Sequence, residues 1–199
     1  AVEAIVRAGW TRLSAVLFPA GYLPVGMALG PLPRSRYAAI LEQSDIGAVC
    51  APAAERLNEG TGAHLVIGVD TPCYDPECGG DQLMVAWAAN RVTGFARKIF
   101  PSDSDTNEER SRPLLIYPDD ADDLNRVAEL PCGRRALLCT CYDAFIFSHL
   151  GQDLQSPWPA IRFVPDGTRG WRWAEVADRR AILSRFRALM ATLQPSVAL

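Results

Sequence analysis

Apolar residues recur along the chain in two patterns, a helical spacing of three to four residues and short continuous runs. The helical spacing and its flanking turn residues predict helices over 1–10, 33–43, 52–59 and 174–193. The short runs predict buried strands over 13–18, 64–69, 82–89, 135–140 and 160–164, and the last four residues look like the opening of another strand. This alternation of helices and strands is typical of a layered α/β domain.

Length and charge restrict the classes of protein to which the chain can belong. Its 199 residues predict a single domain over 1–199, and a hydrophobic share of 49% predicts a packed core. The net charge of −3 disfavours nucleic acid and anionic membranes as partners. The stretch 13–33 carries no charge, but we expect no membrane span because four prolines would break the helix, Pro19, Pro24, Pro31 and Pro33.

The six cysteines predict a reducing, cytoplasmic location, because a chain of this length can build a core without a disulfide framework. Most of the thiols are then expected to be buried. Cys73 and Cys78 are five residues apart, but no second pair of cysteines or histidines follows at the spacing of a zinc site. We therefore expect neither a metal nor a cofactor.

Two segments carry residues that could do chemistry. Cys141 follows the predicted strand 135–140, and the carboxyl end of a buried strand is where α/β proteins place ligands. A thiolate at that position requires a nearby cation, whereas Cys139 points to the same side but deeper, which favours a packing role. Lys98 follows Arg97 between an apolar strand and a proline-terminated turn. Taken singly, a strand-end cysteine is usually part of the core, and such a basic pair is usually exposed.

A third segment, Ala15-Val16-Leu17-Phe18-Pro19-Ala20, is an apolar run that ends in Phe-Pro-Ala. In order and spacing, the three segments resemble the nitrilase, or carbon–nitrogen hydrolase, superfamily. The resemblance spans about 1–150, and its most specific pieces are Arg97-Lys98-Ile99-Phe100-Pro101 and Leu138-Cys139-Thr140-Cys141-Tyr142-Asp143. It implies a layered α-β-β-α sandwich, which would be incomplete at the C-terminus of this chain.

The resemblance also implies roles for individual residues. Cys141 would be the nucleophile, Lys98 would stabilise the oxyanion, and Glu109 is the best match to the glutamate that supports this lysine in the family. Residues that select the substrate are expected in loops and include Tyr22, Tyr142 and Phe145. The implied activity is hydrolysis of a small-molecule amide or nitrile through a cysteine thioester, and the resemblance also favours a homo-oligomer.

The chain departs from the family at its general base. The family motif ends in Phe-Pro-Glu, whereas Ala20 stands here and cannot accept a proton. Three explanations are open: an engineered substitution that traps bound substrate, a natural loss of activity, or replacement by another acid, with Glu55 and Asp143 as candidates. The second hypothesis for function is therefore a catalytically inactive binding or assembly module on the nitrilase scaffold. The substitution Ala20→Glu separates the two hypotheses, because it would raise turnover only in a disabled enzyme.

Overall fold

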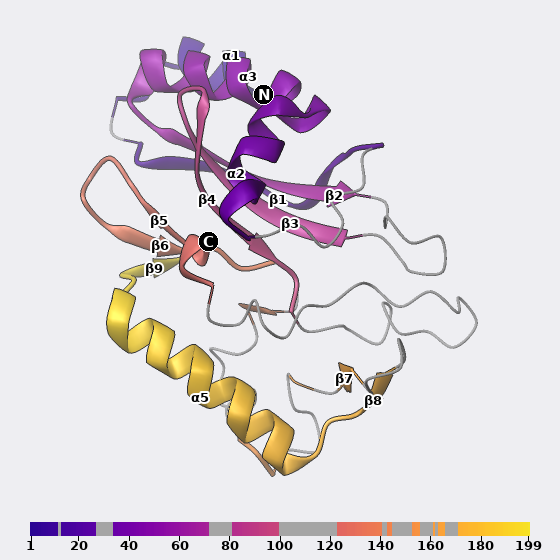
Figure 1. The fold of residues 1–199 in the computed structure, drawn as a ribbon. Coiled ribbons are helices and arrows are strands. Elements are labelled where there is room, and N and C mark those ends of the chain that lie inside the picture. The colour runs from indigo at the N-terminus through magenta and orange to yellow at the C-terminus, as the bar shows by residue number, and fades with distance from the viewer. Residues whose placement is uncertain are drawn as a thin grey trace.

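A computed structural model describes residues 1–11, 13–26, 34–71, 81–99, 123–140, 143–144, 153–155, 161, 163–165 and 171–199. Within these ranges, the helices are α1 (Val2–Arg7), α2 (Arg34–Gln43), α3 (Asp45–Thr61), the 3-10 helix η3 (Leu124–Arg126) and α5 (Val176–Leu193). The strands are β1 (Ala15–Pro24), β2 (His64–Thr71), β3 (Asp81–Ala88), β4 (Arg91–Arg97), β5 (Val127–Glu129), β6 (Arg135–Leu137), β7 (Phe163–Pro165), β8 (Trp171–Trp173) and β9 (Val197–Ala198). The mixed α/β class predicted from the sequence is confirmed (Figure 1).

The first four strands form one sheet in the order β1-β2-β3-β4. β1 and β2 are parallel, whereas β2 with β3 and β3 with β4 form antiparallel pairs. The carboxyl ends of β1, β2 and β4 therefore lie at the same end of the sheet as the beginning of β3. There the register places Asp70 of β2 opposite Gln82 of β3, and Leu83 of β3 opposite Arg97 of β4. We call this end of the sheet its carboxyl end.

The two faces of this sheet belong to different hydrophobic clusters, because side chains alternate along each strand. Leu65 and Ile67 of β2 cluster with Leu57 of α3, on the face that α1, α2 and α3 cover (Figure 1). Val66 of the same strand clusters with Leu138, which directly follows β6 in the second sheet. We call the helix-covered side the outer face of the four-stranded sheet and the opposite side its inner face.

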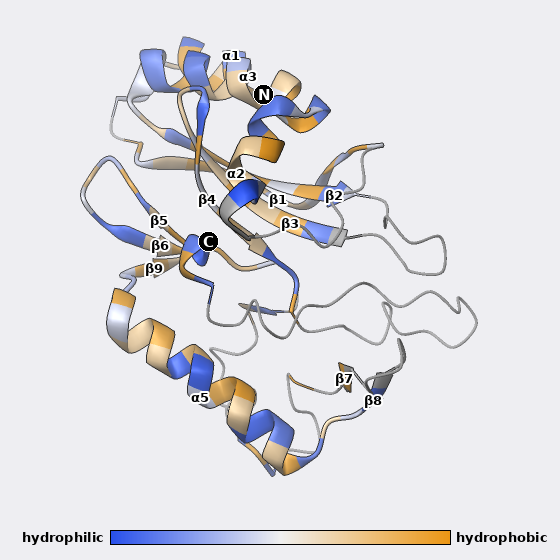
Figure 2. Ribbon diagram, viewed as in Figure 1, coloured by the Kyte–Doolittle hydropathy of each residue, from blue (hydrophilic) through white to orange (hydrophobic). Residues whose placement is uncertain are grey.

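The second sheet, β5-β6-β9, is covered on its other side by α5. Leu137 and Cys139 alternate with Leu138 and cluster with Leu183 and Phe186 of α5. Figure 2 shows apolar residues recurring along α5 between polar ones, which is the pattern of a helix with one buried face. The molecule is thus layered. Helices α1, α2 and α3 cover the four-stranded sheet, the second sheet packs on its inner face, and α5 covers the second sheet.

Helix α3 is longer than the sequence pattern predicted. It begins at Asp45 because the hydroxyl of Ser44 caps its first turn, accepting hydrogen bonds from the amides of Ile46 at 3.2 Å and Gly47 at 3.5 Å. Pro52, which was expected near the start of a helix, lies inside it instead. The prediction of the start was wrong because the cap lies eight residues before the proline, whereas proline is typical of a first turn.

Strand β1 also extends beyond its prediction, running through Pro19 to Pro24. It is an edge strand, where a proline disrupts few hydrogen bonds. Its register against β2 shifts between Phe18 and Leu23, and Gly21 inside this irregularity has a φ of +78°. Among the described residues, no helix is both long and apolar enough to cross a membrane.

Gly68 of β2 permits the irregular part of β1 to lie against the sheet. A Cβ at Gly68 would overlap the carbonyl oxygen of Pro19 and the Cα of Ala20. We therefore expect Gly68→Ala to lower the free energy of unfolding by about 1–3 kcal/mol, as overpacking typically does. Urea denaturation measures this change, with Gly26→Ala as the control because a Cβ there meets nothing within 4 Å. Equal stability of the two variants would contradict the packing of β1 over Gly68.

Candidate active site at the carboxyl ends of the strands

Lys98 directly follows β4 and is buried between the layers, with 2% of its surface exposed. Its ammonium Nζ donates a hydrogen bond to Oε1 of Gln82 at 2.9 Å, and its backbone amide donates to the carbonyl of Gln82 at 2.9 Å. Ala96, two residues earlier, belongs to the cluster between the sheets, so alternation assigns Lys98 to the inner face as well. The interpretation of Arg97 and Lys98 as an exposed basic pair is therefore wrong.

Arg97 extends to the outer face, where it fastens α2 to β4. Its guanidinium donates a hydrogen bond to the hydroxyl of Tyr37 and lies 5.2 Å from the centre of that ring. The Tyr37 ring in turn packs on Phe95, with ring centroids 5.2 Å apart. The two adjacent cations thus have different environments, and Arg97 has a structural role while Lys98 reaches the space between the sheets.

Arg126 of η3 joins the end of β4 to the end of β6. It is fully buried and donates hydrogen bonds to the carbonyls of Arg97 and Leu138. Its Nη2 also lies 3.5 Å from Oδ2 of Asp143, which is itself buried. A buried cation with two carbonyl acceptors and a carboxylate partner is a strong positional constraint, because each of these groups is costly to leave unpaired.

Asp143 holds the segment after β6 against the segment after β4. Both of its carboxylate oxygens lie 3.1 Å from the amide nitrogen of Ile99, which donates to them, and the hydroxyl of Thr140 donates to Oδ2 at 3.0 Å. The backbone amide of Asp143 donates to the carbonyl of Thr140 at 2.9 Å. Residues 140 and 143 are therefore fixed beside Ile99, the immediate neighbour of Lys98. These contacts give the Asp143 carboxylate a positioning role.

Ala20 lies half-buried where β1 crosses the inner face, next to Gly68. Asp70, two residues beyond Gly68, has its side chain on the same face by alternation. Its Oδ2 lies only 3.4 Å from the place that a Cβ at Gly21 would occupy, so the carboxylate lies beside the residue that follows Ala20. Asp70 and Gln82 are opposite one another in the register, so a row of three polar side chains, Asp70, Gln82 and Lys98, crosses the inner face.

Sequence reasoning missed two members of this row, Asp70 and Gln82. Their positions in the sequence could have identified them, because Asp70 directly follows the apolar run 64–69 and Gln82 is the first residue of the run 82–89. Antiparallel pairing of those runs places their adjoining ends together at one end of the sheet. Glu55, a predicted substitute for the missing base, is exposed on α3, which covers the outer face.

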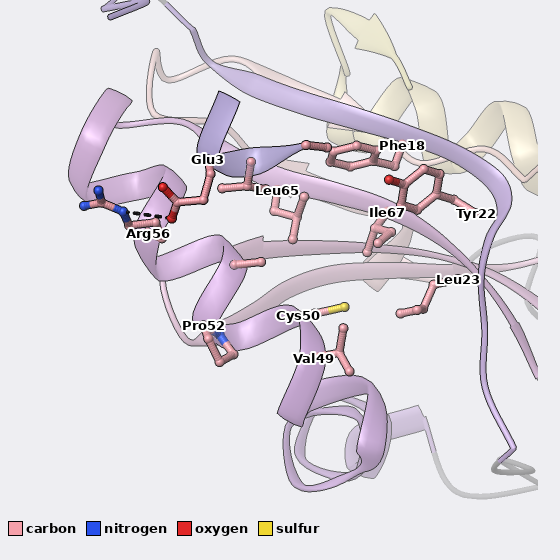
Figure 3. A pocket seen from close by; sticks show the side chains of 13 residues that line it. Glu3, Phe18, Tyr22, Leu23, Val49, Cys50, Pro52, Arg56, Leu65 and Ile67 are labelled. Carbon is pink, nitrogen blue, oxygen red and sulfur yellow. Dashed lines mark hydrogen bonds and ion pairs between the residues drawn. The ribbon is translucent and has the colours of Figure 1, made fainter. Parts of the chain in front are cut away.

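Four predicted site residues, Cys141, Tyr142, Glu109 and Phe145, lie outside the described residues. Tyr22 is half exposed and packs against Phe18, with ring centroids 4.5 Å apart. Both rings line a cavity of about 510 Å³ between β1 and α3, together with Ile67 and the thiol-bearing Cys50 (Figure 3). Because Ile67 and Cys50 belong to the outer cluster, this cavity lies on the opposite face of the sheet from Lys98.

The described thiols differ in their expected reactivity. Burial raises the pKa of Cys50 to about 11 and, with a further contribution from the charge of Asp143, that of Cys139 to about 12. Cys132 is exposed, and hydrogen bonding, first with the Ser14 side chain, lowers its pKa. Cys139 is thus a packing residue under α5, as its place in the strand predicted. We therefore expect Cys132 to be the most reactive of these three thiols.

Within the described ranges, no group of three or more histidine, cysteine, aspartate and glutamate side chains could hold a metal ion. The groups available for chemistry at the carboxyl end are therefore the ammonium of Lys98, the side-chain amide of Gln82 and the carboxylate of Asp70. They lie on the side of the sheet that faces the backbone leading into Cys141. No protein-family model matches the sequence, and no curated protein is significantly similar to it, so the function of this site is argued from its geometry.

Proposed function

We propose that this protein hydrolyses the carbon–nitrogen bond of a small amide or nitrile through a thioester on Cys141, with Lys98 stabilising the developing negative charge. One observation carries the proposal. The amide of Ile99 donates to the carboxylate of Asp143, which also accepts from Thr140. Cys141 is bonded to Thr140 in the chain, and Lys98 is bonded to Ile99. The segment carrying the candidate nucleophile and the segment carrying the candidate cation are therefore held together.

The succession of layers supports the nitrilase-like part of the proposal. The resemblance implies an α-β-β-α sandwich, and three separate hydrophobic clusters lie between helices and sheet, between the two sheets, and between the second sheet and α5. Lys98 follows β4, whose Ala96 belongs to the middle cluster, and Thr140 lies two residues after Leu138 of the same cluster. This is the position in which the carboxyl ends of two packed sheets can share one active site.

In the proposed reaction on an amide, the sulfur of Cys141 bonds to the carbonyl carbon, and the electron pair of the π-bond moves to oxygen. The buried ammonium of Lys98 stabilises this oxyanion, an effect typically worth about 3 kcal/mol for one such donor. Gln82 orients the ammonium through its 2.9 Å hydrogen bond. The amine then leaves, and water attacks the thioester to release the acid and the thiol.

The proposal is tested by labelling with chloroacetamide, an electrophilic amide, at pH 7. The variant Cys132→Ser is used because the exposed Cys132, with its lowered pKa, would otherwise compete for the probe. At pH 7 a thiol with a pKa of about 11, such as Cys50, is thiolate in only about one molecule in 10⁴. We expect Cys141 to react at least tenfold faster than Cys50 or Cys139, as measured by peptide mass spectrometry. Equal labelling of all remaining thiols would count against a nucleophilic Cys141.

The inactive binding or assembly module remains the alternative, and Ala20 is the observation that favours it. No proton acceptor is present at that position, and loss of a general base typically slows a reaction by about 10²–10⁴-fold. Selective labelling of Cys141 would be compatible with both functions. Release of product from an acylated Cys141 over repeated turnovers is compatible only with the hydrolase.

A further inference from the structure

A thioester hydrolase requires a group that takes a proton from the attacking water, and Ala20 cannot do so. We propose that Asp70, on the neighbouring strand β2, is the general base of this site. The inference rests on the proposed function and adds a catalytic residue that is absent from the family motif. It is carried by where the carboxylate lies relative to Ala20 and Lys98.

Asp70 lies beside the backbone that follows Ala20. Oδ2 of Asp70 is 3.4 Å from the place of a Cβ at Gly21, and the amide of Val25 donates to the carbonyl of Asp70 at 2.9 Å. The residue after Ala20 is a glycine with a φ of +78°, a backbone conformation that glycine adopts without strain. A carboxylate from the second strand thus lies next to the position at which the family carries one on the first strand.

Asp70 also faces the same space as Lys98. Both side chains lie on the inner face, and Gln82 stands between them, opposite Asp70 in the register and hydrogen-bonded to Lys98. Neighbouring strands are about 4.8 Å apart, so the backbones of Asp70 and Lys98 are separated by about 10 Å. A small amide bound over Gln82 would have a proton acceptor on one side and an oxyanion-stabilising cation on the other.

The other two acids proposed for this role have different surroundings. The carboxylate of Asp143 is occupied by the amide of Ile99, the hydroxyl of Thr140 and the guanidinium of Arg126. Glu55 is exposed on α3, on the far side of the four-stranded sheet. Asp70 is half-buried at the end of β2 and shares the inner face with the rest of the site.

For an amide, Asp70 transfers protons in both halves of the proposed reaction. Asp70 takes the proton of the Cys141 thiol as the sulfur–carbon bond forms and the π-electron pair moves to oxygen. The carbon–nitrogen bond breaks as the pair returns, and Asp70 gives its proton to the leaving nitrogen. Asp70 then takes a proton from water as the new carbon–oxygen bond forms. The carbon–sulfur bond breaks, and the proton returns from Asp70 to sulfur, which releases the acid.

The test uses 4-nitrophenyl acetate and the Cys132→Ser protein. Nitrophenolate leaves without needing a proton, so the release of the first nitrophenolate reports acylation, and the later steady release reports hydrolysis of the acetyl thioester. At pH 9, where an ordinary thiol is largely ionised without the help of a base, we expect Asp70→Asn to keep the initial burst within tenfold and to slow the steady release by about 10²–10⁴-fold. Mass spectrometry should then find a long-lived acetyl group on Cys141. A merely structural role for Asp70 would not separate acylation from hydrolysis in this way.

Three further variants test the assignment of Asp70. Glu55→Gln removes an exposed carboxylate from the outer side and should leave both phases unchanged. Ala20→Glu combined with Asp70→Asn should recover at least tenfold of the lost hydrolysis, because it returns a carboxylate to the neighbouring strand. Ala20→Glu alone should change hydrolysis less than threefold, since the site already has its base, and this measurement does not depend on whether Asp70→Asn folds.

The outcomes distinguish this inference from the proposed function. If Cys141→Ala shows the same burst as the Cys132→Ser parent, the proposed function fails. If the burst requires Cys141 but Asp70→Asn clears the acetyl group as quickly as the parent, the assignment of Asp70 alone is overturned. A rise of 100-fold or more with Ala20→Glu alone would also overturn it, because the site would then have lacked a base.

Discussion

Replacing Lys98 with methionine should slow acylation of Cys141 by 4-nitrophenyl acetate by about 10²–10³-fold, the usual effect of removing one oxyanion-stabilising donor. The reason is the environment of the ammonium. Lys98 is 2% exposed and Gln82 accepts a hydrogen bond from its ammonium at 2.9 Å, so its charge should act on the reacting oxygen with little screening by water. The size of the nitrophenolate burst and its rate constant measure the effect in the Cys132→Ser background.

The same substitution should cost little stability. A buried cation carries a desolvation penalty, so its removal recovers free energy that offsets the loss of its hydrogen bond to Gln82. We expect the urea midpoint of Lys98→Met to stay close to that of the parent while acylation falls. Arg91→Met is the matched control, because Arg91 begins the strand that Lys98 follows but pairs with Glu42 at an exposed position, with Nε 3.2 Å from Oε1. Parallel loss of acylation in both variants would show that Lys98 has no specific role.

Replacing Arg126 with methionine should lower the free energy of unfolding by about 3–5 kcal/mol, as the removal of one partner from a buried ion pair does. The change leaves the Asp143 carboxylate buried without this cation, and it removes donors from the carbonyls of Arg97 and Leu138. Urea denaturation followed by tryptophan fluorescence measures the loss. Residues 140 and 143 should also be held less firmly beside Ile99, so the selectivity of chloroacetamide for Cys141 should decrease.

The control for Arg126 is an ion pair of the same type at the surface. Arg172 lies 2.6 Å from Asp178 at the start of α5, with both side chains partly exposed, and it lowers the pKa of Asp178. Exposed pairs contribute about 0–1 kcal/mol, so Arg172→Met should change stability much less. The double variant Arg126→Met/Asp143→Asn should lose less stability than the two single losses added together, because it leaves no isolated buried charge. A loss below 1 kcal/mol for Arg126→Met would contradict its role in joining the two strand ends.

Individual helices and strands could be predicted from the local pattern of apolar residues, because their spacing depends on residues that are close in the sequence. The apolar run 64–69 and the helical spacing over 174–193 each identify an element, since burial of one face or of a whole strand requires that spacing. The start of α3 could not be predicted in the same way. Pro52 suggested a first turn, but the hydroxyl of Ser44 satisfies the helix amides earlier in the chain. The cap at Ser44 therefore determines where α3 begins, although Pro52 alone would indicate a later start.

The amino-acid sequence by itself determined that Lys98 and Cys141 each follow an apolar run, and that Ala20 supplies no carboxylate. Only the tertiary structure decided that Lys98 is buried on the inner face, that Asp143 reaches Ile99, and that Asp70 stands beside the β1 backbone. The physical reason is register. Strand pairing and alternation determine which face a side chain occupies and which distant residue it meets, and both are settled by contacts between strands.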